Sequence, residues 1–247
     1  MYVKIKFFGC LNDFLPSKKR RKSFDIPVTT RQSVKDIIES AGIPHTEIDL
    51  IVVNNRSVKF SDKIKDNDDI KVYPPGYFPR GVYHYHLQKK DLKYPRFMLD
   101  VHLGRLARLL RMCGIDTGLF KGDSDKDLVD SAIREKRIVL TRDINLLKRS
   151  ILKRGYWIRN DNPEKQLSEI LRRFELIPHF KQFHRCMCCN GLIKSTGKKT
   201  VLDRIPPRTG KWLNEFFKCT SCGKIYWNGS HYLRMAVEIE RLTHFKL

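Results

Sequence analysis

The fold is decided by residues 96–117, which read RFMLDVHLGRLARLLRMCGIDT. Their first positions are mostly apolar, as in a short buried strand that ends near Asp100. Leucines then recur at helical spacing from His102 to Cys113, which predicts a helix, and Gly114 is typical of a helix end. A buried strand followed directly by a helix is how an α/β unit begins.

Strand and helix patterns continue to alternate after this stretch. The predicted elements are a helix over 124–135, a strand over 137–141, a helix over 144–153, a strand over 156–158 and a helix over 163–174. Such alternation is typical of a parallel sheet covered by helices. We therefore expect an α/β domain over residues 95–180.

Aspartates stand where the two main strands of this domain end. Asp100 closes the first strand, and Asp143 follows the strand over 137–141. The functional crevice of a parallel sheet forms outside the carboxyl ends of its strands, so we expect both carboxylates there. An acidic cluster begins the intervening helix, at Asp123, Asp125 and Asp127. Spacing alone does not choose among its members, and acidic residues are also common at helix starts as simple caps.

The charge of the chain indicates its partner. There are 49 Lys and Arg against 27 Asp and Glu, a net charge of +22, and residues 181–247 alone hold 13 basic and 4 acidic residues. Basic residues bind polyanions by releasing counterions from phosphates, so we expect a polyanionic partner such as a nucleic acid. Carboxylates in such a protein suit Mg²⁺ or Mn²⁺, which neutralises phosphate and activates water. A soluble basic protein without such a partner is the alternative.

Composition and the N-terminus argue against several classes. Hydrophobic residues make up 41% of the chain, which argues against disorder. No apolar run approaches the length needed to span a bilayer. The N-terminal stretch MYVKIKFFGC reads as a strand rather than a signal peptide. We expect a cytoplasmic protein that does not act at a membrane.

The first 75 residues predict a β-β-α-β-β domain. Strands are expected over 2–8, 22–28, 49–53 and 70–73, with a helix over 33–41. Ser33 and Asp36 are spaced as a capping box at the helix start. Asn54-Asn55 is typical of a hairpin turn, and Pro74-Pro75-Gly76 ends the domain. Residues 76–94 read as a linker.

Four of the seven cysteines form two Cys-x-x-Cys pairs. The pairs are Cys186 with Cys189, and Cys219 with Cys222. Four thiolates from two such turns match a tetrahedral structural Zn²⁺ site, which predicts a zinc ribbon over 181–247. A closed site of this kind leaves no position for substrate, so the zinc is expected to fold the segment. Cys188, His184 and His231 are possible alternative ligands, and a redox pair is the other interpretation.

Residues 96–117, together with 138–143 (IVLTRD), resemble the mut-seven C-terminal ribonuclease family. That family is similar to PIN domains and ends in a zinc ribbon. Residues 1–75 resemble the ubiquitin-like β-grasp domain that often precedes it. The fold class implied is α/β, with a β-grasp domain (1–75), a linker (76–94), a PIN-like nuclease domain with a parallel sheet (95–180) and a zinc ribbon (181–247).

The resemblance implies a metal-dependent endoribonuclease. The acidic site of the family maps onto Asp100, Asp125 and Asp143, with Mg²⁺ or Mn²⁺ as the catalytic ion. Independently of the resemblance, Arg105, Arg108, Arg111 and Arg142 are placed to contact RNA phosphates beside these aspartates. For the three arginines of the predicted helix, the alternative to phosphate binding is a face that is simply exposed to solvent. Arg142 is equally suited to hold the Asp143 carboxylate in place.

A function of another class fits the same charge and fold. The chain would then be a non-catalytic RNA-binding or ribosome-associated module. The β-grasp domain also resembles sulfur carriers, whose chemistry needs a free C-terminal Gly-Gly. Here the chain continues through Pro74-Pro75-Gly76, so we expect this domain to bind or position something, with its protein partner unknown.

Overall fold

The computed structural model describes residues 1–29, 31–77, 86–88, 94–176 and 183–243. The chain forms two compact units: Met1–Leu92 with Asp143–Trp157, and Lys93–Arg142 with Ile158–Leu247. Most of the predicted linker over 76–94, and the predicted boundary between 180 and 181, lie outside the described residues. Within the described ranges, no helix has both the length and the apolar character needed to cross a membrane.

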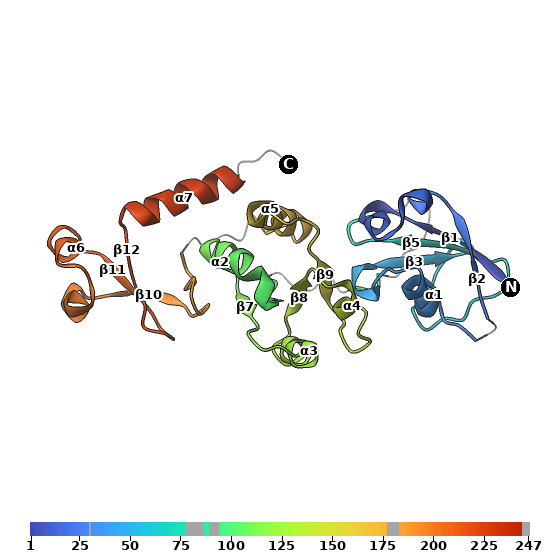
Figure 1. The fold of residues 1–247 in the computed structure, drawn as a ribbon, viewed down its shortest axis with the longest axis horizontal. Helices are drawn as coiled ribbons and strands as arrows, with labels where there is room; N and C mark the ends of the chain where they lie inside the picture. Colours follow the sequence, from blue (N-terminus) through green and yellow to red (C-terminus); the bar gives the residue numbers. More distant parts are fainter. Residues whose placement is uncertain (30, 78–85, 89–93, 177–182, 244–247) are drawn as a thin grey trace. The chain divides into compact units, whose positions relative to one another are not determined.

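The first unit is built on a five-stranded sheet (Figure 1). Its strands are β1 (Tyr2–Phe7), β2 (Phe24–Pro27), β3 (Leu50–Val53), β4 (Arg56–Ser57) and β5 (Asp69–Tyr73), in the order β2-β1-β5-β3-β4. β1 and β5 are parallel in the centre, and the other neighbours are antiparallel. α1 (Val34–Ser40) connects β2 to β3. This confirms the predicted ubiquitin-like β-grasp fold.

Local sequence explains these elements. Ser33 Oγ accepts a hydrogen bond from the Asp36 N–H, and Asp36 Oδ2 accepts one from the Ser33 N–H, so the predicted capping box is present. Asn54 and Asn55 have φ of 48° and 65°, as the tight turn between β3 and β4 requires. Alternate residues of β1 pack with α1 in one apolar core. This core includes Val3, Ile5, Phe7, Ile37 and Ile38.

The first unit also holds a segment from the middle of the chain, residues 143–157. It contains α4 (Ile144–Leu147) and β9 (Gly155–Trp157). The helix predicted over 144–153 therefore ends early, because the Lys148 and Leu152 N–H groups bond to carbonyls three residues back in tight turns. Leu146, Leu147 and Leu152 are buried, so this segment is packed rather than a surface loop.

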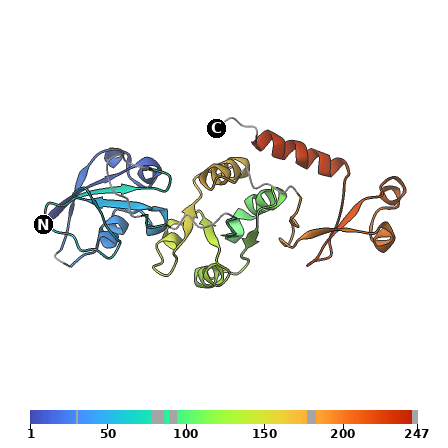
Figure 2. The ribbon, with the colours of Figure 1, turned by 180° about the vertical axis from the view of Figure 1, so that it is seen from behind.

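The second unit contains the predicted parallel sheet. Its strands β6 (Phe97–Leu99), β7 (Thr117–Leu119) and β8 (Ile138–Thr141) lie in the order β7-β6-β8, with Phe97 opposite both Thr117 and Ile138. α2 (Gly104–Met112) and α5 (Pro163–Arg173) lie on one side of the sheet, and α3 (Asp125–Arg134) on the other (Figures 1 and 2). The sequence does not predict β7, because Gly118 interrupts its pattern.

The C-terminal part of this unit is a small antiparallel sheet, here called the ribbon (residues 183–229). Its strands are β10 (Ile193–Thr196), β11 (Phe216–Cys219) and β12 (Ile225–Trp227). α6 (Pro207–Trp212) lies in the connection between β10 and β11, and α7 (Ser230–Thr243) follows the ribbon. Val201, Ile205 and Phe216 form its apolar core.

One carboxylate joins the ribbon to the parallel sheet. Arg96, Asp116 and Arg137 each stand one residue before a parallel strand. Asp116 accepts hydrogen bonds from Arg137 Nη1 at 2.6 Å and Arg96 Nε at 3.2 Å. On the ribbon side, it accepts one from Asn190 Nδ2 at 2.8 Å and pairs with Arg185 Nη2 at 3.1 Å. Burial alone would raise the pKa of Asp116, but these hydrogen bonds and cations hold it below its ordinary value.

Asp116→Asn is expected to destabilise the second unit by roughly 3 kcal/mol, because Arg185 loses its anion and Arg137 keeps only Glu135, while both side chains remain largely covered. Since the folded pKa of Asp116 lies below 3.8, its contribution is present above pH 3.8 and is lost as the pH falls further. The difference in unfolding free energy between wild type and variant should therefore close in that range. Urea unfolding of both proteins at neutral pH and below pH 3.8 measures it.

The exposed Asp203 of the ribbon provides the control variant, Asp203→Asn. If the difference in unfolding free energy between wild type and Asp116→Asn were as large below pH 3.8 as at neutral pH, the charge of Asp116 would not be what stabilises this junction.

Candidate functional site

Asp100 is held at the carboxyl end of the parallel sheet. It follows β6 and caps the short helix Val101–Leu103, where its Oδ1 accepts a hydrogen bond from the His102 N–H at 2.9 Å. Its Oδ2 accepts a hydrogen bond of 2.8 Å from the hydroxyl of Thr141, the buried last residue of β8. The carboxylate is therefore fixed by two neighbouring strand ends. Sequence reasoning missed Thr141, although it stands beside Arg142-Asp143 in the IVLTRD stretch.

Asp143 follows Thr141 by two residues in the chain and is exposed. It caps α4, with Oδ1 accepting a hydrogen bond from the Asn145 N–H at 2.8 Å. Asp143 belongs to the first compact unit, whereas Asp100 belongs to the second. The predicted convergence of the two carboxylates stays a prediction.

The third acidic position lies at the start of α3. Asp125 is the first residue of this helix, and Ser124 caps it by accepting a hydrogen bond from the Asp127 N–H at 3.3 Å. Asp123, Asp125 and Asp127 are all exposed, so geometry does not select among them. Among the described residues, the aspartates are not gathered into a group of three or more potential metal ligands in the way that the cysteines are.

The four predicted arginines have different environments. Arg105 and Arg108 are exposed on α2. Arg142 is exposed and forms an ion pair with Asp161. Contact of these three arginines with RNA stays a prediction.

The expectation for Arg111 is wrong, because its side chain is only 4% exposed. Its Nε donates to the Thr117 carbonyl at 2.9 Å, and its Nη1 donates to the carbonyls of Met187 and Cys188, each at 3.0 Å. A guanidinium with these partners is not available to phosphate. The sequence carried no signal for this, because the partners of Arg111 lie 76 and 77 residues further along the chain.

The predicted cysteines come together in the ribbon. The sulfur atoms of Cys186, Cys189, Cys219 and Cys222 all lie within 4.8 Å of one another. Cys186 and Cys222 are 3.6 Å apart at Sγ, and Cys189 and Cys219 are 3.4 Å apart. Two thiolates on one tetrahedral zinc lie about 3.8 Å apart, given Zn–S bonds of about 2.3 Å.

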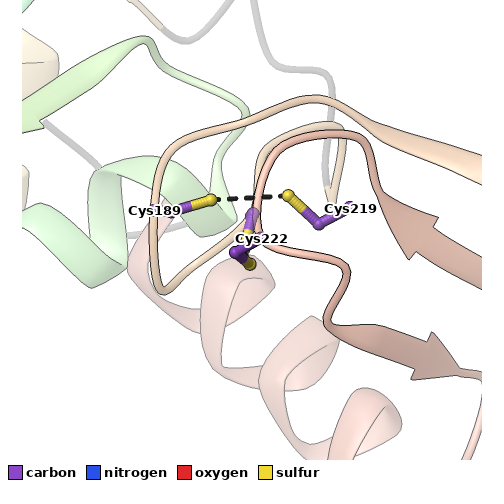
Figure 3. A group of neighbouring side chains, drawn as sticks. Cys189, Cys219 and Cys222 are labelled. Carbon is purple, nitrogen blue, oxygen red and sulfur yellow. Dashed lines mark hydrogen bonds between the residues drawn. The ribbon is translucent and has the colours of Figure 1, made fainter.

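Figure 3 shows Cys189 and Cys219 facing each other, with Cys222 beside them. Cys188 is exposed and lies outside the group, and so does His184; the side chain of His231 lies outside the described residues. The four sulfurs thus fit a tetrahedral cation without any of these alternatives.

The turns around the cysteines are built for close approach. Asn190 and Gly223, which follow the two pairs, have φ of 70° and 71°. A Cβ on Gly191 would lie 2.9 Å from Cys219 Sγ and would clash with the Ser221 side chain, so glycine is needed where the two turns meet. The Ser221 N–H points at Cys219 Sγ, 3.4 Å away. These contacts support sulfur as a metal ligand.

The thiols do not ionise alike. Burial alone would raise the pKa of Cys186, but the Tyr226 hydroxyl, 3.0 Å away, and backbone N–H groups lower it to about 6. The pKa of Cys189 is raised to about 12, first by burial and then by the neighbouring thiols. Thiols crowded in this way lose their protons together only beside a cation, as a metal ion provides. Sequence reasoning had not assigned Tyr226 a place at this site.

The cysteine site lies at the amino ends of the parallel strands, and Asp100 lies at their carboxyl ends. Thr117 begins β7, and its N–H donates to Asn190 Oδ1 at 3.0 Å while its carbonyl accepts from Arg111. The first cysteine turn is therefore attached where the strands begin. Asp100 and Thr141 stand where the strands end. This separation argues that the cysteine site stabilises the fold and takes no direct part in chemistry at Asp100.

The aromatic residues of the ribbon differ in how far their side chains are exposed. Phe216 is buried in the ribbon core, and Phe217, Tyr226 and Trp227 are half-buried. Trp212, the last residue of α6, is 83% exposed. Packing in the ribbon core thus accounts for Phe216 and Trp227, and contact with Cys186 accounts for Tyr226, but neither accounts for Trp212.

Comparisons with known proteins match both parts of the chain. The family model described as the Mut7-C RNAse domain matches residues 95–239, and the model described as Mut7-C ubiquitin matches residues 1–77. Among solved structures, the chain is similar to a molybdopterin converting factor, subunit 1, from Pyrococcus furiosus. That match has 26% identity and a TM-score of 0.24, and covers 30% of this chain and 97% of that one. A TM-score this low does not establish a shared fold.

None of the curated proteins matches the chain. The Mut7-C RNAse match spans more than half of the 247 residues and indicates a ribonuclease-type function. This family match agrees with the structure, in which Asp100 stands at the end of a parallel strand and a ribbon with four gathered cysteines follows the sheet in the chain. The chain belongs to the Mut7-C RNAse family, with a Mut7-C ubiquitin domain at its N-terminus.

Proposed function

We propose that this chain is a metal-dependent endoribonuclease that hydrolyses RNA phosphodiester bonds, with Asp100, Asp125 and Asp143 as its acidic site. The observation that carries the proposal is the 2.8 Å hydrogen bond from Thr141 to Asp100, which fixes a carboxylate at the ends of two parallel strands. The family match supports the reaction class. Asp143 follows the same strand end by two residues, which supports its inclusion.

The residues suit a hard divalent ion. Carboxylate oxygens are the ligands that Mg²⁺ prefers and Mn²⁺ accepts. Such an ion, when bound, neutralises phosphate charge and makes its water more acidic. The protein orients the carboxylates: the His102 N–H and the Thr141 hydroxyl hold both oxygens of Asp100. Exposed Arg105 and Arg108 lie on the helix that follows Asp100 and are proposed to bind the RNA phosphates.

We propose further that the four gathered cysteines hold a structural Zn²⁺. Their sulfur separations fit tetrahedral coordination, and the first pair is tied to the parallel sheet through Arg111 and Asn190. A metal at this point stabilises the attachment of the ribbon to the nuclease sheet.

Trp212 is proposed to stack on an unpaired base of the RNA. Its ring is exposed, and the connection around α6 is basic. Residues 197–214 hold Lys198, Lys199, Arg204, Arg208 and Lys211 against Asp203 alone. An exposed ring among cations is the arrangement by which proteins hold single-stranded nucleic acid.

Asp143→Asn should abolish Mg²⁺- or Mn²⁺-dependent cleavage of single-stranded RNA while RNA affinity stays the same or rises slightly. Asparagine keeps the oxygen that caps α4, so the fold should survive, but the charge that recruits the ion is lost. Binding should weaken steeply with salt, because the basic surface supplies most of it. Cleavage and binding are measured on one RNA at fixed salt.

Asp25→Asn serves as the control, since it removes the same charge from an exposed position of β2 that has no proposed role in binding RNA. Cleavage by Asp143→Asn at the wild-type rate would remove Asp143 from the site. A wild type that cleaves no RNA with either metal would favour the non-catalytic RNA-binding module.

Elemental analysis of protein purified without chelator should find one Zn²⁺ per chain. Cys189→Ser should lose it, because three thiolates hold zinc less tightly than four. Cys188→Ser is the matched control, since this neighbouring cysteine is also exposed but lies outside the group. Loss of zinc from Cys188→Ser but not from Cys189→Ser would show that the ligand set is different.

Trp212→Ala should weaken binding of single-stranded RNA by an amount equivalent to roughly 1–3 kcal/mol, the usual contribution of one stacked base. Trp212→Phe should recover most of the affinity, because it keeps a ring. Affinity for duplex RNA should change little, since paired bases do not stack on side chains. Fluorescence anisotropy with labelled RNAs tests all three, and an equal loss for duplex and single strand would contradict stacking.

A further inference from the structure

Three polar residues in a row are buried in the β-grasp domain. His45, Thr46 and Glu47 form a single 3-10 turn, here called the polar turn, between α1 and β3. Their exposed fractions are 8%, 2% and 1%. A connecting turn of this composition normally lies at the surface, because burying a carboxylate costs free energy unless it is hydrogen-bonded. Something must therefore cover the polar turn and supply its partners.

The cover is the segment 143–157. Glu47 Oε1 accepts a hydrogen bond from the Trp157 N–H at 2.6 Å. His45 Nε2 lies 2.7 Å from the Leu152 carbonyl oxygen, to which it donates. The Trp157 ring packs against that of Phe14, with centroids 4.8 Å apart. Two side chains of the β-grasp domain thus bind the backbone of a segment more than 100 residues away in the chain.

The polar turn is itself held firmly from other directions. Gln88 Nε2 donates to the carbonyls of Thr46 at 2.6 Å and Ile48 at 3.0 Å. His45 Nδ1 is 2.7 Å from Glu39 Oε1, which fixes the plane of the ring. The turn is therefore ordered by other residues of the first unit, Glu39 and Gln88, and presents His45 Nε2 and Glu47 Oε1 in fixed positions. A rigid receptor of this kind sets the position of whatever binds to it.

The bound segment begins with Asp143. This aspartate caps α4, whose Leu146 and Leu147 are buried, and the segment ends at β9, whose last residue is Trp157. The cap, the buried leucines and the two backbone contacts form one packed piece of the first unit. The packed segment thus connects the contacts at Leu152 and Trp157 to Asp143.

We propose that the β-grasp domain positions Asp143, with Glu47 and His45 as positioning residues that hold the segment 143–157. This inference rests on the proposed nuclease function, in which Asp143 belongs to the acidic site. It gives the N-terminal domain an intramolecular role that needs no free C-terminus. A carboxylate moved by about 1 Å loses on the order of a hundredfold in rate, so small displacements matter.

The test compares two substitutions in the full chain. Glu47→Ala removes the acceptor for the Trp157 N–H, whereas Glu47→Gln keeps an oxygen at that position. Asp69→Ala is the matched control, because it removes a carboxylate of the same unit that forms an ion pair with Lys71, far from the polar turn in sequence. Amide hydrogen exchange over residues 152–157 should become faster in Glu47→Ala and stay near wild type in the other two.

The kinetic readout separates positioning from general damage. In Glu47→Ala, kcat should fall by about ten- to a hundredfold, while KM for RNA and the zinc content stay within twofold of wild type. Glu47→Gln should restore most of kcat. Should Glu47→Ala fail to fold, His45→Ala provides the same test through the Leu152 contact.

Unchanged exchange over 152–157 in a folded Glu47→Ala would show that the polar turn does not hold the segment. Faster exchange with an unchanged kcat would show that the segment does not position a catalytic group. Either result overturns the proposal. If wild type cleaves no RNA, the nuclease function fails by itself, and the exchange measurement still decides whether the β-grasp domain holds the segment.

Discussion

The Asp116 carboxylate fixes the register of three short parallel strands at the point where they begin. β6, β7 and β8 are only three or four residues long, so their ladders contribute few hydrogen bonds and need a further constraint on register. Arg96 and Arg137 stand one residue before their strands, and both pair with Asp116, one residue before β7. Because the register is fixed where the strands begin, the positions of Asp100 and Thr141, where they end, are fixed as well. The same carboxylate reaches Asn190, so the cysteine site and the sheet share one anchor.

Elements with strong local signals were predictable from sequence. The Ser33–Asp36 capping box, the Ser124 cap and the Pro163 helix start all depend on neighbouring residues, and the structure has them. β7 was not predictable, because three residues around Gly118 become a strand only by pairing with β6. The early end of α4 has the same origin, because packing in the first unit determines the path of the chain after Leu147, and the sequence pattern does not record that packing.

The residues of the candidate site also divide into those that local sequence predicts and those that depend on distant partners. Asp100 and the cysteine pairs follow from strand ends and spacing, which are local properties. Arg111 resembles its exposed neighbours in composition, yet its partners lie 76 and 77 residues away, in the first cysteine turn. Glu47 is likewise an ordinary acidic residue in sequence, and its burial depends on the Trp157 backbone 110 residues later. Long-range partners of this kind are invisible to periodicity and motif arguments, whereas the residues that they hold are often visible.

The first unit is built from two separate stretches of the chain, and these leave the ribosome at different times. Translation delivers Met1–Leu92 well before Asp143–Trp157, and at ordinary rates the gap is roughly 3–13 seconds. During that time the β-grasp sheet can form, but the carboxylate of Glu47 and the imidazole of His45 still lack the Leu152 and Trp157 backbone. The N-terminal domain therefore leaves the ribosome as an open receptor, and the arrival of the later segment closes it. Order of emergence thus favours docking of the segment onto a template that is already folded.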